Sequence, residues 1–137
     1  MTTADLEPCT SDPSLCDVLI VEDDALQAAE LAGFLRRAKL RVEISHDGST
    51  GLHRAAVAQP RVAILDYNLP ALDGAQVAER IRAVSPRTAT ILVSGRIDPP
   101  TETTLTRLGI CAFRNKPLAL APLQTLVSKL IRGGPST

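Results

Sequence analysis

The sequence predicts one α/β domain, in which a five-stranded parallel sheet carries helices on both faces. The first observation is that short apolar runs alternate five times with segments whose apolar residues recur at helical spacing. The second is that the runs 18–21 and 62–65 are apolar at every position, which is typical of strands buried on both faces. With 137 residues the chain can bury one such core, and we expect no room for an attached output or DNA-binding module.

The composition restricts the partners that this domain is expected to have. Lys and Arg together number 15, as do Asp and Glu, so we expect no bulk attraction to nucleic acid or to a membrane surface. No segment approaches the ~18 consecutive apolar residues of a membrane-inserted helix. Cys9, Cys16 and Cys111 have no metal-ligand spacing. We therefore expect a reduced cytoplasmic protein, with Cys111 as a small buried hydrophobic side chain.

The chain divides into a domain and two short ends. Residues 1–16 lack periodicity and are predicted to be a flexible tail, the domain covers 17–131, and 132–137 form a short C-terminal tail. The predicted strands are 18–21, 40–45, 62–66, 89–93 and 111–115. The predicted helices carry their apolar faces at Ala28, Leu31, Ala32 and Leu35; at Leu52, Ala55 and Ala56; at Val77, Ala78, Ile81 and Val84; at Leu105 and Leu108; and at Leu123, Leu126, Val127 and Leu130.

The boundaries of these elements carry their own signals. Asp24 and Gln27 have the spacing of a capping box for the first helix. Pro60 ends the second helix, and Pro70 with Gly74 marks the loop 67–74 after the central strand. The segment 97–108 contains Pro99-Pro100 and four Thr, so we expect a short, marginal fourth helix there and a mobile segment.

The strand ends bring reactive side chains to one edge of the sheet. Glu22 and Asp23 follow the first strand, Asp66 ends the third, Ser94 ends the fourth and Lys116 follows the fifth. Clustered carboxylates need a counter-charge, and hard oxygen ligands suit Mg²⁺, which binds one or two carboxylates together with phosphate oxygens. The pattern thus indicates a phosphate substrate, for which a carboxylate is a possible nucleophile, and a lysine and a hydroxyl stabilise its charge.

Four motifs in order give the chain a specific resemblance. They are Val21-Glu22-Asp23-Asp24, the stretch from Leu65-Asp66 to Asp73-Gly74, Val93-Ser94-Gly95, and Phe113-Arg114-Asn115-Lys116-Pro117. Through them, residues 17–131 resemble the response-regulator receiver domain of two-component signalling, in particular the stand-alone type found in chemotaxis. The resemblance implies a flavodoxin-like sheet with strand order 2-1-3-4-5 and five helices.

The resemblance also implies a role for each motif residue. Asp66 would be the phosphoacceptor, and Asp23, Asp66 and the backbone carbonyl of Asn68 would bind Mg²⁺, with Glu22 acting through a metal-bound water. Lys116 would pair with the phosphoryl group, Ser94 would hydrogen-bond to it, and Phe113 would be an aromatic switch. The implied donor is a histidine kinase or histidine phosphotransferase, and an unknown downstream protein would bind the surface of the fourth helix, fifth strand and fifth helix.

Two alternatives and some departures from the family pattern stay open. A receiver-like adaptor that works without phosphorylation would not need this full set of residues. An aspartate-nucleophile phosphohydrolase would need a second carboxylate as acid/base two residues after the nucleophile, where this chain has Asn68. We therefore expect the chain not to be an enzyme, with no activity beyond self-phosphorylation and slow autodephosphorylation. Arg114 and Asn115 stand where the family usually has apolar residues between the aromatic residue and the lysine. Arg96 puts a long cationic side chain near Asp66, and Gly95 removes a side chain beside Ser94.

Overall fold

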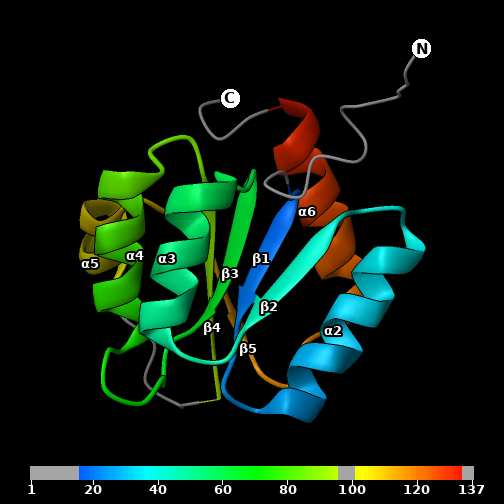
Figure 1. Ribbon diagram of the computed structural model, residues 1–137, viewed down its shortest axis with the longest axis horizontal. Coiled ribbons are helices and arrows are strands. Elements are labelled where there is room, and N and C mark those ends of the chain that lie inside the picture. The colour runs from blue at the N-terminus through cyan, green and yellow to red at the C-terminus, as the bar shows by residue number, and fades with distance from the viewer. Residues whose placement is uncertain (1–15, 96–100, 134–137) are drawn as a thin grey trace.

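The computed structural model describes residues 16–95 and 101–133, which form five strands and five helices (Figure 1). The elements in chain order are β1 (Val18–Val21), α2 (Ala25–Arg37), β2 (Val42–Ser45), α3 (Gly48–Ala58), β3 (Val62–Asp66), α4 (Gly74–Val84), β4 (Ala89–Ser94), α5 (Glu102–Leu108), β5 (Ile110–Asn115) and α6 (Leu120–Gly133). The strands are parallel and lie in the order β2-β1-β3-β4-β5, so the predicted fold is confirmed.

The sheet is the middle of three layers. α2 and α6 cover one face, where they pack on side chains such as Val18, Ile20 and Ile64. α3 and α4 cover the other face and pack on the alternate strand positions, including Leu19 and Leu65 (Figure 1). Every residue of β1, β3 and β4 is buried, whereas the edge strands β2 and β5 are partly exposed. No helix in the described ranges is both long and apolar enough to cross a bilayer.

The capping box predicted at Asp24 forms only in half. The Asp24 carboxylate accepts the Gln27 backbone N–H at 3.0 Å, but the Gln27 side chain donates to that same carboxylate. The reason is that Glu22 Oε2 already accepts the Asp24 N–H, at 3.2 Å. A complete capping box occurs instead at the start of α4, between Asp73 and Gln76.

Two predicted core positions are wrong. Ala56 is exposed because α3 buries a face of small residues that includes Ala55 but not Ala56, and Val84 is exposed because it is the last residue of α4, whose predicted face is otherwise buried. The buried residues of α3 are Gly48, Gly51, Ala55 and Ala58. α3 approaches the sheet so closely that a Cβ on Gly51 would lie 2.7 Å from a methyl group of Val21. Small residues therefore form its inner face, and hydrophobic periodicity alone did not reveal them.

The two described cysteines reverse the expectation from sequence. Cys111 is exposed, because the β4–β5 register shifts there: Thr90 pairs with Ile110 and Ile91 with Ala112, which leaves Cys111 without a partner residue on β4. Cys16, assigned to the tail, is buried in the cluster under α3 and α4. Burial, the largest cause, raises the pKa of the Cys16 thiol to about 12. Residues 1–15 and 97–100, parts of the predicted tail and mobile segment, lie outside the described residues.

Two glycines should respond in opposite directions to substitution by alanine. Gly109 ends α5 at φ +74°, and an added Cβ would also lie 3.3 Å from the Arg82 side chain. Gly109→Ala should therefore lower the free energy of unfolding by about 1–2 kcal/mol. Gly33 lies inside α2 with nothing within 4 Å of an added Cβ, so Gly33→Ala should raise it by about 0.5–1 kcal/mol. Urea denaturation measures both, and equal effects would contradict the described backbone.

Candidate functional site

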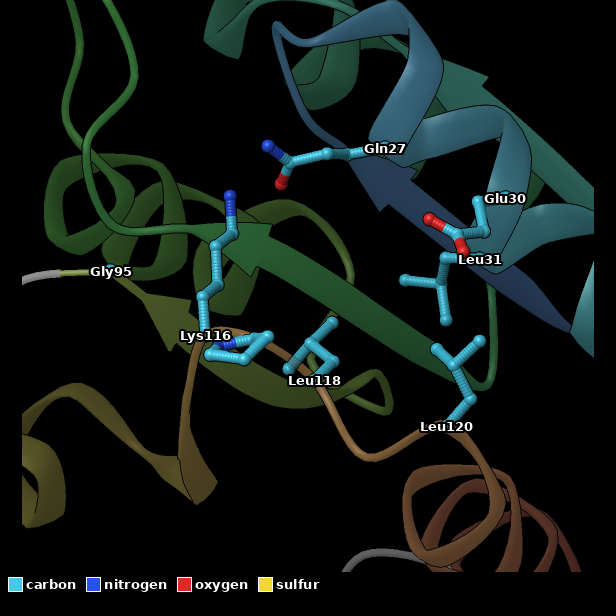
Figure 2. A pocket seen from close by; sticks show the side chains of 8 residues that line it. Gln27, Glu30, Leu31, Gly95, Lys116, Leu118 and Leu120 are labelled. Carbon is cyan, nitrogen blue, oxygen red and sulfur yellow. The ribbon is translucent and has the colours of Figure 1, made fainter.

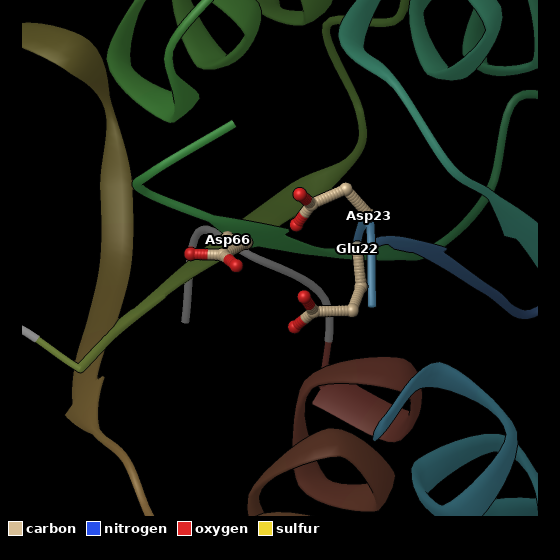
Figure 3. A group of neighbouring side chains, drawn as sticks. All are labelled: Glu22, Asp23 and Asp66. Carbon is tan, nitrogen blue, oxygen red and sulfur yellow. The ribbon is translucent and has the colours of Figure 1, made fainter. Parts of the chain in front are cut away.

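Three carboxylates meet at the carboxyl ends of β1 and β3. Val21 pairs with Leu65, so the residues that follow, Glu22 with Asp23 and Asp66, leave the sheet side by side. One oxygen from each of the three carboxylates lies within 4.8 Å of the others (Figure 3). Glu22 is 6% and Asp66 5% exposed, whereas Asp23 is open to solvent. The cluster is thus buried on one side and accessible on the other.

Lys116 supplies the counter-charge to the two buried carboxylates. Its Nζ lies 2.7 Å from Glu22 Oε1 and 3.1 Å from Asp66 Oδ2. The Lys116 backbone N–H donates to the Ser94 carbonyl at 2.8 Å, which continues the β4–β5 pairing and aims the side chain along this edge. Burial disfavours the ammonium, but the two carboxylates outweigh it and raise the pKa of Lys116. Burial, the largest effect on Glu22, raises the pKa of that carboxyl despite the ion pair.

The loop after β3 holds Asp66 and Ser94. The Asn68 backbone N–H donates to Asp66 Oδ1 at 3.0 Å, and Asn68 Nδ2 donates to Ser94 Oγ at 3.4 Å. Ser94 is buried at the end of the neighbouring strand β4. From the sequence only the backbone carbonyl of Asn68 was expected to take part in the site, and neither of these donors was predicted. In turns an Asp side chain often accepts the backbone N–H of the residue two positions later, so the bond from Asn68 to Asp66 could have been predicted from the sequence.

Gly74 contributes to the site through its missing side chain. Its N–H donates to the Tyr67 carbonyl at 2.9 Å, which closes the loop against the end of β3. A Cβ on Gly74 would lie 2.6 Å from the Asp66 carbonyl oxygen and 2.7 Å from Tyr67 Cα, closer than real Cβ contacts allow. Gly74 was expected only to mark the loop 67–74, whereas its missing side chain lets α4 begin directly against the backbone of Asp66.

The remaining predicted residues lie further along the sheet. Phe113 is half-buried and, like Leu105, packs against the core cluster on the α4 side of the sheet. Phe113 pairs with Leu92 in the sheet, two residues before Ser94 on β4. Arg114 is exposed, and its guanidinium donates to the Phe113 carbonyl at 3.0 Å. Arg96 lies outside the described residues.

A cavity of about 480 Å³ adjoins the site between α2 and the segment after β5. Its lining residues are Gln27, Glu30, Leu31, Gly95, Lys116, Pro117, Leu118 and Leu120. Figure 2 shows Lys116 and Gln27 at one end of this cavity and Leu31, Leu118 and Leu120 at the other. Lys116 therefore borders both the carboxylate cluster and an open space that is apolar along one side.

The donor set of the site fits a small hard cation. Carboxylate oxygens, which Glu22, Asp23 and Asp66 supply, are the ligand type that Mg²⁺ prefers. Mg²⁺ also keeps bound water and binds phosphate oxygens, and the solvent-exposed side at Asp23 leaves room for both. Among the residues that the structure describes, Lys116 is the one cation paired with the two buried carboxylates, so negative charge is in excess within this described cluster.

Comparison with known proteins gives concordant results. The family model described as "Response regulator receiver domain" matches residues 18–128. The transcriptional regulatory protein PrrA of Mycobacterium tuberculosis is 32% identical over 120 residues, which are 88% of this chain and 52% of PrrA. The transcriptional regulatory protein CutR of Streptomyces coelicolor is 30% identical over 115 residues, 84% of this chain and 53% of CutR. The chain thus spans about half the length of the curated relatives that it matches.

Solved receiver domains have the same fold. The CheY-like receiver domain protein of Methanospirillum hungatei superposes with a TM-score of 0.80 at 23% identity, covering 86% of this chain and 94% of that one. The receiver domain of the putative response regulator NarL from M. tuberculosis gives a TM-score of 0.76 at 26% identity, covering 88% and 99%.

Removing the ammonium of Lys116 should destabilise the metal-free protein in a pH-dependent way. In Lys116→Met, Glu22 and Asp66 keep their burial without a counter-charge, so we expect the free energy of unfolding to fall by about 1–3 kcal/mol near pH 7.5. Burial already raises the pKa of Glu22 above its ordinary value of 4.5. The ionised carboxylate is therefore less stable in the folded state than in the unfolded chain, and this cost grows as pH rises above 4.5. The loss should therefore shrink toward pH 4.5, as urea titrations in EDTA would show.

The control is the exposed ion pair between Arg54 and Glu43, at 2.7 Å with both side chains 29% exposed. Arg54→Met should cost below about 1 kcal/mol. A Lys116→Met loss that is equally large at both pH values would show that the lysine acts through packing alone.

Proposed function

This chain belongs to the response regulator receiver domain family, and from that premise we propose that Asp66 accepts a phosphoryl group from a histidine kinase or histidine phosphotransferase. The observation that carries the proposal is the environment of Asp66. Its carboxylate ends the central strand, contacts Lys116 Nζ and the Asn68 N–H, and lies within the cluster formed with Glu22 and Asp23. The proposed cytoplasmic location goes with this function.

In the proposed transfer, an Asp66 carboxylate oxygen bonds to phosphorus while the bond between phosphorus and the donor histidine nitrogen breaks. Lys116 Nζ already contacts Asp66 Oδ2, so its ammonium lies where negative phosphoryl oxygens would gather. The Asn68 N–H holds the other carboxylate oxygen and orients the group. We propose Ser94 as the hydroxyl that hydrogen-bonds the transferred group.

We further propose that Asp23, Asp66 and the Asn68 backbone carbonyl hold Mg²⁺, with Glu22 acting through a metal-bound water. The grouping of the three carboxylates and the open side at Asp23 support this assignment. When bound, Mg²⁺ supplies positive charge against the phosphoryl oxygens.

The two alternatives receive less support from these contacts. A phosphohydrolase would place an acid or base two residues after Asp66, whereas Asn68 is there and its amide donates to Ser94. A phosphorylation-independent adaptor would not need an ion pair between Lys116 and two buried carboxylates, which is costly to desolvate.

We propose that phosphorylation is transmitted to the surface formed by α5, β5 and α6, where a downstream protein binds. Ser94 ends β4, and Phe113 pairs with Leu92 on the same strand and packs against the core on the α4 side. A movement of Ser94 toward the phosphoryl group would therefore alter the packing of Phe113. Phosphorylation shifts this equilibrium only as far as it stabilises one state over the other. The relatives named as transcriptional regulators contain about as much chain again, so the downstream partner stays a proposal.

Replacing the acceptor should abolish covalent labelling. With a small-molecule phosphodonor and Mg²⁺, intact mass should rise by one phosphoryl group in the wild type and stay unchanged in Asp66→Asn. The carboxyl oxygen that forms the bond is absent in the variant. The added mass should be lost under alkaline conditions, as expected for an acyl phosphate.

The matched control is Asp47→Asn, because Asp47 is an exposed helix cap outside the cluster and Asn caps equally well. It should label as the wild type does. Asp23→Asn should need more Mg²⁺ for the same rate, and undiminished labelling of Asp66→Asn would overturn the assignment.

Helix α5 should be the least protected helix and should respond to phosphorylation. It has seven residues, and Leu108 is its only fully buried residue. We expect amide hydrogen exchange to be faster at residues 101–108 than at 28–35 of α2, and to slow when beryllofluoride and Mg²⁺ are added. Equal protection of the two helices, with no response to the phosphoryl mimic, would contradict the proposed output surface.

A further inference from the structure

The described charges divide between the two edges of the sheet, although the chain has no net charge. At the edge where the strands end, Lys116 contacts Glu22 and Asp66, and Asp23 lies in the same carboxylate cluster. The acidic helix caps Asp24, Asp47 and Asp73 begin the helices that follow the strands at this edge. The strands begin, and α2 and α6 end, at the opposite edge (Figure 1). The exposed charged side chains of the segments at that edge are mostly cationic. We define the basic edge by the exposed residues Arg36, Arg37, Lys39, Arg41, Arg61 and Arg132.

Little negative charge compensates the basic edge. Arg36 donates to the Val42 carbonyl at 2.8 Å, and Arg61 donates to the Ile131 carbonyl at 2.7 Å. These neutral acceptors fix the position of the guanidinium groups but do not neutralise their charge. Among the described residues, the only carboxylate within ion-pair distance of the basic edge is Asp17, 3.4 Å from Arg41. The edge therefore has an unfilled capacity for an anionic partner.

The chain enters the fold in the middle of this edge. The backbone of Asp17 donates to the Arg41 carbonyl at 2.8 Å and accepts from the Arg61 N–H at 3.1 Å, so it lies between two cationic residues. The Asp17 side chain also accepts the Arg41 N–H at 2.8 Å. Whatever precedes Cys16 in the chain is tethered at the basic edge.

The fifteen residues before Cys16 have the complementary charge. They contain Asp5, Glu7 and Asp12 and no Lys, Arg or His. These carboxylates lie within about 15–40 Å of chain from Cys16, which is enough to reach every residue of the basic edge. We propose that residues 1–15 dock on the basic edge of their own domain through these carboxylates, as Asp17 already does with Arg41.

Tethering makes weak contacts sufficient. A segment of this length is held at an effective concentration on the order of millimolar, so each ion pair can be as weak as exposed pairs usually are. The contact should weaken with salt, because the cationic side chains of the basic edge are exposed to solvent. Docking would screen the basic edge from other acidic ligands, and it is independent of phosphorylation at the far edge.

A nitroxide on Cys9 tests this arrangement, because Cys9 lies between Glu7 and Asp12. Cys111 is exposed and is replaced by serine, and Cys16 is buried, so a single label is expected and mass spectrometry verifies it. We expect paramagnetic broadening of the amides of Lys39, Arg61 and Arg132 in dilute buffer. This broadening should fall at least twofold in the variant Asp5→Asn/Glu7→Gln/Asp12→Asn, whose tail carries no acidic side chain but has the same length and the same attachment to the domain.

Neutralising the other side, with Lys39→Gln/Arg132→Gln, should reduce the broadening near Arg61 similarly, with no further loss when both sets are combined. About 300 mM NaCl should mimic either set. Broadening that is unchanged by the neutral tail would overturn the proposal, since tethering alone would then explain it. Equal broadening in ¹⁵N-labelled protein mixed with a separate spin-labelled copy would also overturn it, in favour of contact between molecules.

Discussion

The ion pair of Lys116 with Glu22 and Asp66 joins three parts of the chain that are distant in sequence. Glu22 follows β1, Asp66 ends β3, and Lys116 follows β5, so the carboxyl edge of the sheet cannot assemble until all three strands are paired. The two carboxylates are buried, and each depends on the same ammonium for its counter-charge. The complete ion pair therefore requires all three strands to be in place.

The loop after β3 holds Asp66, the proposed acceptor, through short-range contacts. Asn68 binds Asp66 through its backbone and Ser94 through its side chain, and Gly74 brings the start of α4 against the Asp66 carbonyl. These contacts involve only residues 66–74 and the end of β4. The carboxylate thus has a defined direction on its loop side, while its other oxygen faces Lys116.

Much of the fold and of the grouping of site residues could be predicted from the sequence, because both follow from strand ends in a parallel sheet. The apolar runs of β1 and β3 located Glu22, Asp23 and Asp66 correctly at one edge. The errors lie where contacts between elements decide the outcome. Ala56 is exposed because α3 packs its glycines against the sheet, which its apolar pattern did not indicate. The capping box at Asp24 is incomplete because the Asp24 N–H donates to Glu22 instead. The bond from Asn68 to Ser94 joins the loop after β3 to the end of β4, so no local pattern predicts it.

The register shift between β4 and β5 has a practical consequence. It leaves Cys111 exposed on an edge strand, next to the half-buried Phe113 and within the surface proposed for partner binding. The other described thiol, Cys16, is buried and stays protonated through the neutral range because its pKa is about 12. Once Cys9 is replaced, a polarity-sensitive dye can be attached at one natural position of this surface. The domain thereby carries its own attachment point for an optical sensor of the signalling state.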